Sequence, residues 1–374
     1  MKKVLSIALC AVVAFSMVGC GAKSSTDSAK TSSKTEVSAS KTASKSSATS
    51  TASSAKSTAS AASAVNTADE EAWKKEPAYG KTLKFLTGDG CTSAVNVAQE
   101  LGYYKEQGLT VEGFKGDSDV EAIGTNQVRI AIGHIAKSMV PATNGVNLCF
   151  VGGAHLLTGC KAMYVLDESN YKSYDDLKGK SISAPSGIGT ADYNISARLF
   201  IEAGIDPLKD LKIVQVEKDA CVAAMKSGEI AAALLPESYG YPLVKQGLLR
   251  KVESADGNSR NELCCIVMMN KDFIKENPIT SAKMASAVKK ALKWMGDNPE
   301  DCTKLLMKIG LNGSDYDMNL ELNKLMQFGK QTDEYTTEQM KGIVDGYINA
   351  KLITATTDAD AVYKSIWNPI GSAE

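Results

Sequence analysis

Two histidines and some of the cysteines are the residues best suited to chemistry in this sequence. His134 and His155 are the only histidines, and each follows a predicted strand. His155 stands five residues before Cys160. Together with Cys91, these two side chains offer a mixed set of nitrogen and sulfur donors for a soft metal ion or a thiophilic ligand. Because the spacing is not that of a zinc motif, we predict no metal and no cofactor.

The remaining cysteines indicate free thiols rather than a disulfide framework. Apart from Cys10 and Cys20 near the N-terminus, the sequence contains Cys91, Cys149, Cys160, Cys221, Cys264, Cys265 and Cys302. An odd number with two adjacent members suits disulfide pairing poorly. Several lie in apolar runs, where cysteine behaves as a small buried hydrophobe.

The loop after the first predicted strand is a candidate ligand contact. It contains Asp89, Gly90 and Cys91. Ligands of α/β proteins bind at the carboxyl ends of strands, and a glycine lets the backbone approach a ligand closely. The alternative is a simple turn that buries a cysteine.

A glycine-rich loop precedes a predicted helix further along the chain. Its candidate ligand contacts are Ser186, Gly187, Gly189 and Thr190. Free backbone N–H groups and the positive end of the helix dipole favour an anion at such a position. The alternative is that Thr190 only caps the helix while the glycines form the turn.

Glu237 and Tyr239 follow another predicted strand and could hydrogen-bond a ligand from the opposite side. A carboxylate at Glu237 would repel an anion unless it is protonated or paired with Arg or Lys. Arg129 and Arg198, the arginines nearest these elements, are predicted to face away. The acidic side chain therefore favours a polar solute with donor groups, whereas the glycine-rich loop favours an anion, and both alternatives stay open.

From Thr82 the chain alternates apolar runs with amphipathic ones, which is typical of an α/β fold with mostly parallel sheets. The predicted strands are 83–87, 109–114, 128–132, 148–152, 161–166, 181–184, 211–216, 230–235 and 263–269. The predicted helices between them are 92–101, 135–143, 190–203, 220–226 and 237–245. After Asp272 helices follow one another at 281–295, 299–309, 319–328 and 337–350. The methionines of the last strand are interpreted as core.

The N-terminal residues resemble the signal of a bacterial lipoprotein. Lys2 and Lys3 precede an apolar run that ends in Met17–Cys20 (MVGC), which is similar to a lipobox. We predict a signal peptide at 1–19 and lipidation, with acyl chains such as palmitate, at Cys20. Residues 21–66 contain 34 Ser, Thr or Ala among 46 positions, so we predict a disordered tether over 20–66.

The charge distribution argues against nucleic acid as a partner. The net charge is -1, and the first 66 residues carry eight lysines against two acidic residues. The rest of the chain is therefore acidic, whereas binding to a nucleic-acid backbone requires a basic surface. The sequence also contains no P-loop, GxGxxG or GxSxG motif, and we predict no catalytic residue.

Four segments, in order, resemble solute-binding proteins of the nitrate, sulfonate, taurine and pyrimidine-precursor group. The segments are 101–112 (LGYYKEQGLTVE), 176–180 (DLKGK), 224–232 (AMKSGEIAA) and 236–239 (PESY). The resemblance spans about residues 81–310 and depends on order and spacing more than on any one motif. In this family the last segment carries a ligand-facing acid and an aromatic residue.

The resemblance implies a two-lobed periplasmic-binding-protein-like fold of type II, with mixed, mostly parallel sheets flanked by helices. Two crossover strands, at Ala162–Asp167 and Leu263–Asn270, would join lobe one (80–166 plus 270–374) to lobe two (167–269). The implied function is capture of a small polar solute in the cleft and its delivery to an ABC permease with its ATPase. We expect a monomer, anchored by lipid on the extracytoplasmic face of the cell membrane.

Two other functions are compatible with the same fold. One is an enzyme similar to pyrimidine-precursor synthases, in which histidine and clustered cysteines support iron chemistry; His134, His155 and Cys264–Cys265 are the residues that suggest it. Export argues against this reading, because a cytosolic synthase would carry neither signal nor tether. The other is a sensory lipoprotein without a role in transport.

Overall fold

The structure is a computed structural model that describes residues 67–252 and 262–373. The described residues belong to one compact unit, Ser63–Glu374. The predicted signal peptide, the lipidation site at Cys20 and the tether at 20–66 lie outside the described residues. Within the described part, no helix combines the length and the apolar character needed to cross a membrane.

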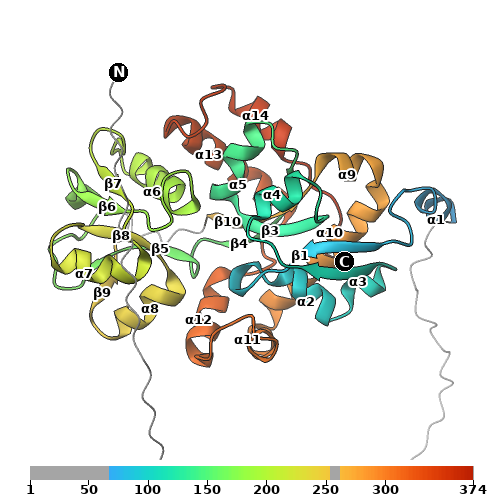
Figure 1. Cartoon of the computed structure of the whole chain (residues 1–374), viewed down its shortest axis with the longest axis horizontal. Helices are drawn as coiled ribbons and strands as arrows, with labels where there is room; N and C mark the ends of the chain where they lie inside the picture. Colours follow the sequence, from blue (N-terminus) through green and yellow to red (C-terminus); the bar gives the residue numbers. More distant parts are fainter. Residues whose placement is uncertain (1–66, 253–261, 374) are drawn as a thin grey trace, which may run out of the picture. The chain divides into compact units, whose positions relative to one another are not determined.

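The first sheet has five strands, and four of them run in the same direction (Figure 1). In spatial order they are β2 (Thr110–Phe114), β1 (Thr82–Leu86), β3 (Ile130–His134), β10 (Leu263–Met269) and β4 (Cys149–Leu156). Strand β1 pairs in parallel with β2 and β3, whereas β10 is antiparallel to both of its neighbours. The reversed strand is therefore β10.

The second sheet repeats this arrangement with β5 as its reversed strand. In spatial order it contains β7 (Lys212–Val214), β6 (Ser181–Ser183), β8 (Ala232–Pro236), β5 (Lys161–Leu166) and β9 (Leu249–Lys251). Strand β6 pairs in parallel with β7 and β8, and β5 is antiparallel to β8 and β9. The predicted α/β fold with mixed, mostly parallel sheets is confirmed.

Helices surround both sheets. Those associated with the first sheet are α1 (Thr67–Trp73), η1 (Gly90–Thr92), α2 (Ala94–Glu100), α3 (Tyr103–Glu106), α4 (Asp119–Gly124), α5 (Ile135–Thr143), α9 (Lys271–Glu276), α10 (Pro278–Asp297), α11 (Pro299–Lys308), α12 (Tyr316–Met326), α13 (Asp333–Asn349) and α14 (Ala359–Ile366). Those between β5 and β10 are η2 (Asp175–Leu177), α6 (Ala191–Glu202), η3 (Lys218–Ala220), α7 (Cys221–Lys226) and α8 (Glu237–Lys245). Helix α10 packs on α2, α3 and β4, and α12 packs on α11 and α8.

The two strands predicted as crossovers are the reversed strands β5 and β10. The chain leaves the first sheet after Leu156 and enters the second at Lys161. All seven residues of β10 are buried, including Met268 and Met269, which are core residues as predicted. A central strand buried on both faces reads as a continuous apolar run, which explains why its bounds match the prediction.

Strand β4 is longer than predicted, and this corrects the placement of His155. We predicted a strand end at Gly152, with His155 in the loop that follows, but β4 continues to Leu156. The two glycines do not form a turn. A Cβ on Gly152 would lie 2.6 Å from Lys289 Cε, and one on Gly153 would lie 2.4 Å from Thr336 Oγ1. The absence of a side chain at these two positions therefore lets β4 pack closely against α10 and α13.

Candidate functional site

A cavity of about 700 Å³ lies where the carboxyl ends of strands from both sheets meet. Its walls come from the loop after β1, the end of β3, the segment joining β4 to β5, the start of α8, and the α11–α12 region. The lining residues are Asp89, Gly90, Cys91, His134, Gly159, Cys160, Lys161, Pro236, Ser238, Gly310, Leu311, Asn312, Gly313, Met318, Asn319, Leu322, Asn323 and Met326. Such a cavity is large enough for a small solute.

Four of the predicted ligand contacts line this cavity: Asp89, Gly90, Cys91 and His134. Asp89 is the N-cap of helix η1, which follows β1 after a short loop and contains Gly90 and Cys91. Gly90 has a positive φ of 45°, and its N–H donates to the carbonyl of Leu311 at 2.8 Å. This bond fixes the loop against the α11–α12 connection, so that the thiol at position 91 has a defined place at the cavity wall.

Six sulfur and nitrogen donors gather at one side of this cavity. They form four overlapping triads within which the donor atoms lie no more than 4.8 Å apart. The triads are Cys91 with His155 and Cys160, Cys91 with His134 and Cys265, His134 with Cys160 and Cys264, and His155 with Cys264 and Cys265. We call these six residues the thiol–imidazole cluster. The sequence suggested the first triad, and the fold adds the other three members.

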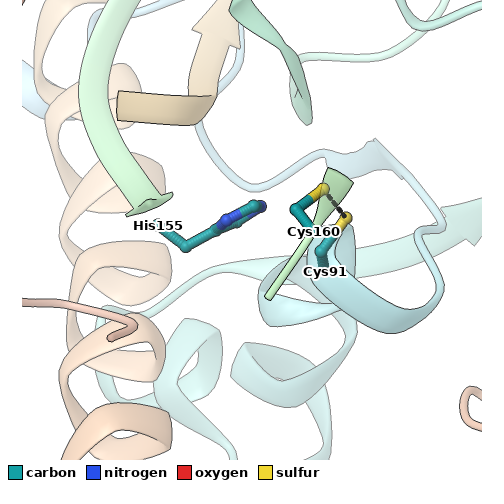
Figure 2. Close-up of side chains that lie close together, drawn as sticks. All are labelled: Cys91, His155 and Cys160. Carbon is teal, nitrogen blue, oxygen red and sulfur yellow. Dashed lines mark hydrogen bonds between the residues drawn. The ribbon is translucent and has the colours of Figure 1, made fainter. Parts of the chain in front are cut away.

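His155 contributes a fixed and unused nitrogen to the cluster. The side chain is fully buried in β4, and its Nδ1 lies 2.7 Å from the carbonyl oxygen of Leu156. Since a carbonyl only accepts, Nδ1 carries a proton, and in the neutral imidazole the lone pair is on Nε2. Nε2 is buried and has no hydrogen-bond partner among the described residues. Figure 2 shows the ring pointing toward the sulfur atoms of Cys91 and Cys160.

His134 lies between two thiols. Its Nδ1 is 3.2 Å from Cys264 Sγ, and its Nε2 is 3.8 Å from Cys160 Sγ. Burial lowers the pKa of the imidazole, but the negative charges of Cys264 and Cys160 outweigh burial, and the pKa is well above its ordinary value. Burial raises the pKa of the Cys264 thiol, but hydrogen bonds from Cys160 and Cys265 and the charge of His134 lower it well below the ordinary value. The two groups therefore shift each other's pKa in the direction of the charged forms.

The glycine-rich loop at residues 186–190 does not line the cavity in this structure. The backbone N–H and the hydroxyl of Ser186 both donate to Asp192 Oδ2, at 3.0 and 2.6 Å. Gly187 and Gly189 have φ values of 90° and 80°, and the Thr190 hydroxyl donates to the Gly187 carbonyl. A carboxylate of the chain itself thus occupies the start of α6, where the sequence suggested an external anion.

Glu237 is paired within the protein instead of facing the cavity. Its carboxylate is buried, accepts a hydrogen bond from the Tyr164 hydroxyl at 2.7 Å, and lies 2.6 Å from Lys251 Nζ. The ring of Tyr239 lies under the ammonium group of Lys218, 5.2 Å from its centroid. The neighbouring Ser238 lines the cavity, but these two predicted contacts do not.

Lys161 is the one lysine among the lining residues, and it already has a partner. Its Nζ lies 2.6 Å from Asp192 Oδ1, and the lysine is only 12% exposed. Arg198 is buried and paired with Glu262 and Glu202, and Arg129 stacks over Phe273. Neither arginine lines the cavity, in agreement with their predicted orientation.

The sequence analysis did not predict that α12 lines the cavity. It assigned the helices after Asp272 to lobe one and named no ligand contact among them. Its cavity-lining residues are Met318, Asn319, Leu322, Asn323 and Met326. They recur at intervals of three and four, so they share one helical face. The signal that could have revealed them is the alternation of asparagine and methionine on that face, instead of a purely apolar stripe.

Solved structures of two binding proteins have a fold similar to that of this chain. The alkanesulfonate-binding protein SsuA of Xanthomonas axonopodis pv. citri, bound to MOPS, aligns with a TM-score of 0.59 at 15% identity, over 78% of this chain and 99% of that one. The periplasmic nitrate-binding protein NrtA of Synechocystis PCC 6803 aligns with a TM-score of 0.58 at 17% identity, over 77% and 86%. A curated binding protein of Brucella abortus (strain 2308) is 21% identical over 271 residues, which are 70% of this chain and 79% of that protein.

The fold is therefore that of the periplasmic binding proteins, as predicted. Residues 92–302 match the family described as NMT1/THI5 like. The chain belongs to this family, and the resemblance noted from the four sequence segments is confirmed.

Proposed function

We propose that this protein is an extracytoplasmic solute-binding lipoprotein of an ABC import system. It captures a small polar solute in the cavity between the two sheets and delivers it, chemically unchanged, to a permease and its ATPase. The observation that carries the proposal is the 700 Å³ cavity, to which both sheets contribute. A solute that contacts both sheets at once stabilises one arrangement of them, which is how binding proteins signal occupancy.

Thermal unfolding of the full chain, purified without oxygen, tests solute binding. The panel contains nitrate, alkanesulfonates, taurine, pyrimidine precursors, thiamine, riboflavin and metal ions. A ligand at 100 times its dissociation constant adds about 2.7 kcal/mol to the free energy of unfolding, which raises the midpoint by a few degrees. The bound solute, recovered and analysed by mass spectrometry, should be unaltered; a converted product would overturn the proposal in favour of an enzyme.

Lipid anchoring at Cys20 is part of the same proposal and is tested separately. The wild-type chain should sediment with membranes and incorporate labelled palmitate. Cys20→Ala should remain unlabelled and soluble, whereas Cys10→Ala, which removes the other cysteine of the N-terminal segment, should behave as wild type. Equal labelling of both variants would overturn the assignment of the anchor.

A further inference from the structure

The thiol–imidazole cluster has no role in the general function proposed above. It forms part of the cavity wall, so an inference about it rests on the proposed function and narrows the class of ligand that the cavity takes.

The spacing of the two thiols at the cavity wall suits one metal ion between them. Cys91 and Cys160 have their sulfur atoms 3.8 Å apart, and both side chains line the cavity (Figure 2). A metal–sulfur bond of about 2.3 Å with tetrahedral angles places two thiolate ligands about 3.8 Å apart. The two sulfurs therefore already have the separation of a pair of ligands on one ion.

The third donor is the His155 nitrogen that the protein leaves without a partner. A ring nitrogen of His155 lies within 4.8 Å of both sulfurs, and Nε2 is the ring nitrogen without a hydrogen bond. A buried polar atom without a hydrogen bond is costly unless something else satisfies it. A histidine whose other ring nitrogen donates to a backbone carbonyl is the usual form of a metal-ligating histidine, because the carbonyl fixes both the tautomer and the ring orientation.

Further soft groups line the same cavity as this triad. Met318 and Met326 line the same cavity from α12, and His134 lines it from the end of β3. Thiolate, thioether and imidazole donors together select soft ions such as Cu⁺ and Zn²⁺ over hard ions. A triad with an open fourth position can exchange its ion or accept a ligand already bound to that ion.

The polar side chains of the cavity wall other than His134 offer little to a free oxyanion. Lys161 is paired with Asp192, and the exposed carboxylate of Asp89 adds negative charge to the wall. The side-chain amides of Asn319 and Asn323 donate to the Gly313 carbonyl and to the Thr303 hydroxyl.

We propose that the solute of this protein is a soft transition-metal ion of the Cu⁺ or Zn²⁺ class, coordinated by Cys91 Sγ, Cys160 Sγ and His155 Nε2. The two cysteines bind as thiolates and release their protons to the solvent. The fourth ligand approaches from the cavity, which leaves room for either water or a small chelate that carries the ion.

Cobalt titration of the full chain tests the site directly. Co²⁺, added without oxygen to protein stripped of metal, should bind with a stoichiometry of one. It should show a thiolate charge-transfer band and the visible bands of tetrahedral coordination. Cys91→Ser and Cys160→Ser should each weaken binding by on the order of 100-fold or more and reduce the charge-transfer band. His155→Gln should keep that band but change the visible bands.

The matched control is Cys302→Ala, which removes a fully buried thiol outside the cluster. It should bind Co²⁺ as wild type does. Circular dichroism of every variant identifies any that fail to fold, and the altered band pattern of His155→Gln is a readout that misfolding does not produce. Absence of stoichiometric binding to the wild type, or equal binding to all variants, would overturn the proposal.

Parallel titrations with Zn²⁺ and Cu⁺, each alone and each as its histidine complex, identify the form of the cargo. Tighter binding of the complex indicates a chelate, and equal binding indicates the ion. If no ion binds but another solute stabilises the chain, the metal proposal fails and the transport function stands. If the ion binds but cells that lack this protein take it up unchanged, the transport function fails and the site stands.

Discussion

The two sides of the cavity treat their polar groups in opposite ways. On the side of the second sheet, Lys161 is paired with Asp192, and Glu237 is paired with Lys251 and Tyr164. On the side of the first sheet, the thiol–imidazole cluster concentrates six donors, one of which is buried without a hydrogen bond. The groups on the side of the second sheet are paired with one another. The cluster on the side of the first sheet retains a buried nitrogen without a hydrogen bond.

The two sides therefore differ in role: the paired groups stabilise the fold, and the cluster is available to bind a ligand. Buried charges that are paired with each other contribute to the folded state, and removing one partner leaves the other uncompensated. In the cluster, by contrast, the thiols and His134 make only long contacts with one another and His155 Nε2 makes no hydrogen bond, so these groups contribute little to folding and are available to a ligand. Four substitutions test this separation, in order of their expected effect on the stability of the metal-free protein.

Glu237→Ala should have the largest effect. The variant leaves the fully buried Tyr164 hydroxyl without its acceptor and Lys251 without its counterion, so the free energy of unfolding should fall by about 3 kcal/mol in urea denaturation. The matched control is Glu112→Ala, which breaks an exposed pair with Lys84 and should change stability by less than about 0.5 kcal/mol. Similar values for the two variants would contradict the structural role of Glu237.

Gly240→Ala should cost about 2 kcal/mol, although alanine is the better helix former. A Cβ at this position in α8 would lie 2.2 Å from Tyr164 Cζ and would displace the ring from Glu237. Gly342→Ala in α13 is the control, because its Cβ would meet nothing within 4 Å. It should stabilise the protein by about 0.5 to 1 kcal/mol in the same urea experiment. If Gly240→Ala stabilises the protein, the ring of Tyr164 can move away from the new methyl group at little energetic cost.

Asp192→Asn should cost about 1.5 kcal/mol at neutral pH, because Lys161 loses its counterion but keeps an oxygen acceptor. Burial raises the pKa of Asp192, but the charge and hydrogen bond of Lys161 outweigh burial and hold the pKa below its ordinary value. A carboxyl whose pKa is lowered by folding stabilises the protein above the unfolded pKa of about 4 and loses this contribution as the pH falls through the folded value.

The difference between wild type and Asp192→Asn should therefore shrink below about pH 4. Urea unfolding at a series of pH values measures it. Asp301→Asn, which removes an exposed charge on α11, should show no comparable difference at any pH. If the difference in the free energy of unfolding stays constant below pH 4, the ion pair with Lys161 is not its source.

Cys91→Ser should have the smallest effect on the protein without added metal, below about 0.5 kcal/mol, because its side chain is partly exposed and a serine hydroxyl can replace its one long contact with the Cys160 thiol. Cys302→Ser should cost more, about 1 to 2 kcal/mol, since it places a hydroxyl in a fully buried apolar position. Thermal unfolding without metal compares the two. A large loss in Cys91→Ser would show that the cluster serves the fold, and the separation between the two sides would fail.

Local sequence patterns were sufficient for most of the sheet and helix content. The bounds of β5, β10, α5 and α8 match the predictions residue for residue. Their apolar runs are bounded by clear breaks, and β10 is buried along its whole length. Elements of three to eight residues such as β9, α4 and α14 were missed, because so few residues give no readable period.

The candidate site was predictable only in part. Asp89, Gly90, Cys91 and His134, which were chosen because they follow strands, line the cavity, and their contact with a ligand stays a prediction. Ser186 and Glu237 were also chosen as groups at strand ends, but each has a partner within the chain, Asp192 for one and Tyr164 with Lys251 for the other. A position at a strand end predicts the edge of the sheet at which a residue lies. It does not predict whether another side chain of the protein forms a hydrogen bond or ion pair with that residue.

The sequence by itself determined the α/β class, the family and the kinds of donor available, because these depend on local periodicity, segment order and residue type. Only the tertiary structure decided that Cys91, His134, His155, Cys160, Cys264 and Cys265 meet at one place. These donors are up to 174 positions apart in the chain. They come together because β1, β3, β4 and β10 lie side by side in one sheet, and strand pairing over such separations depends on the packing of the whole molecule.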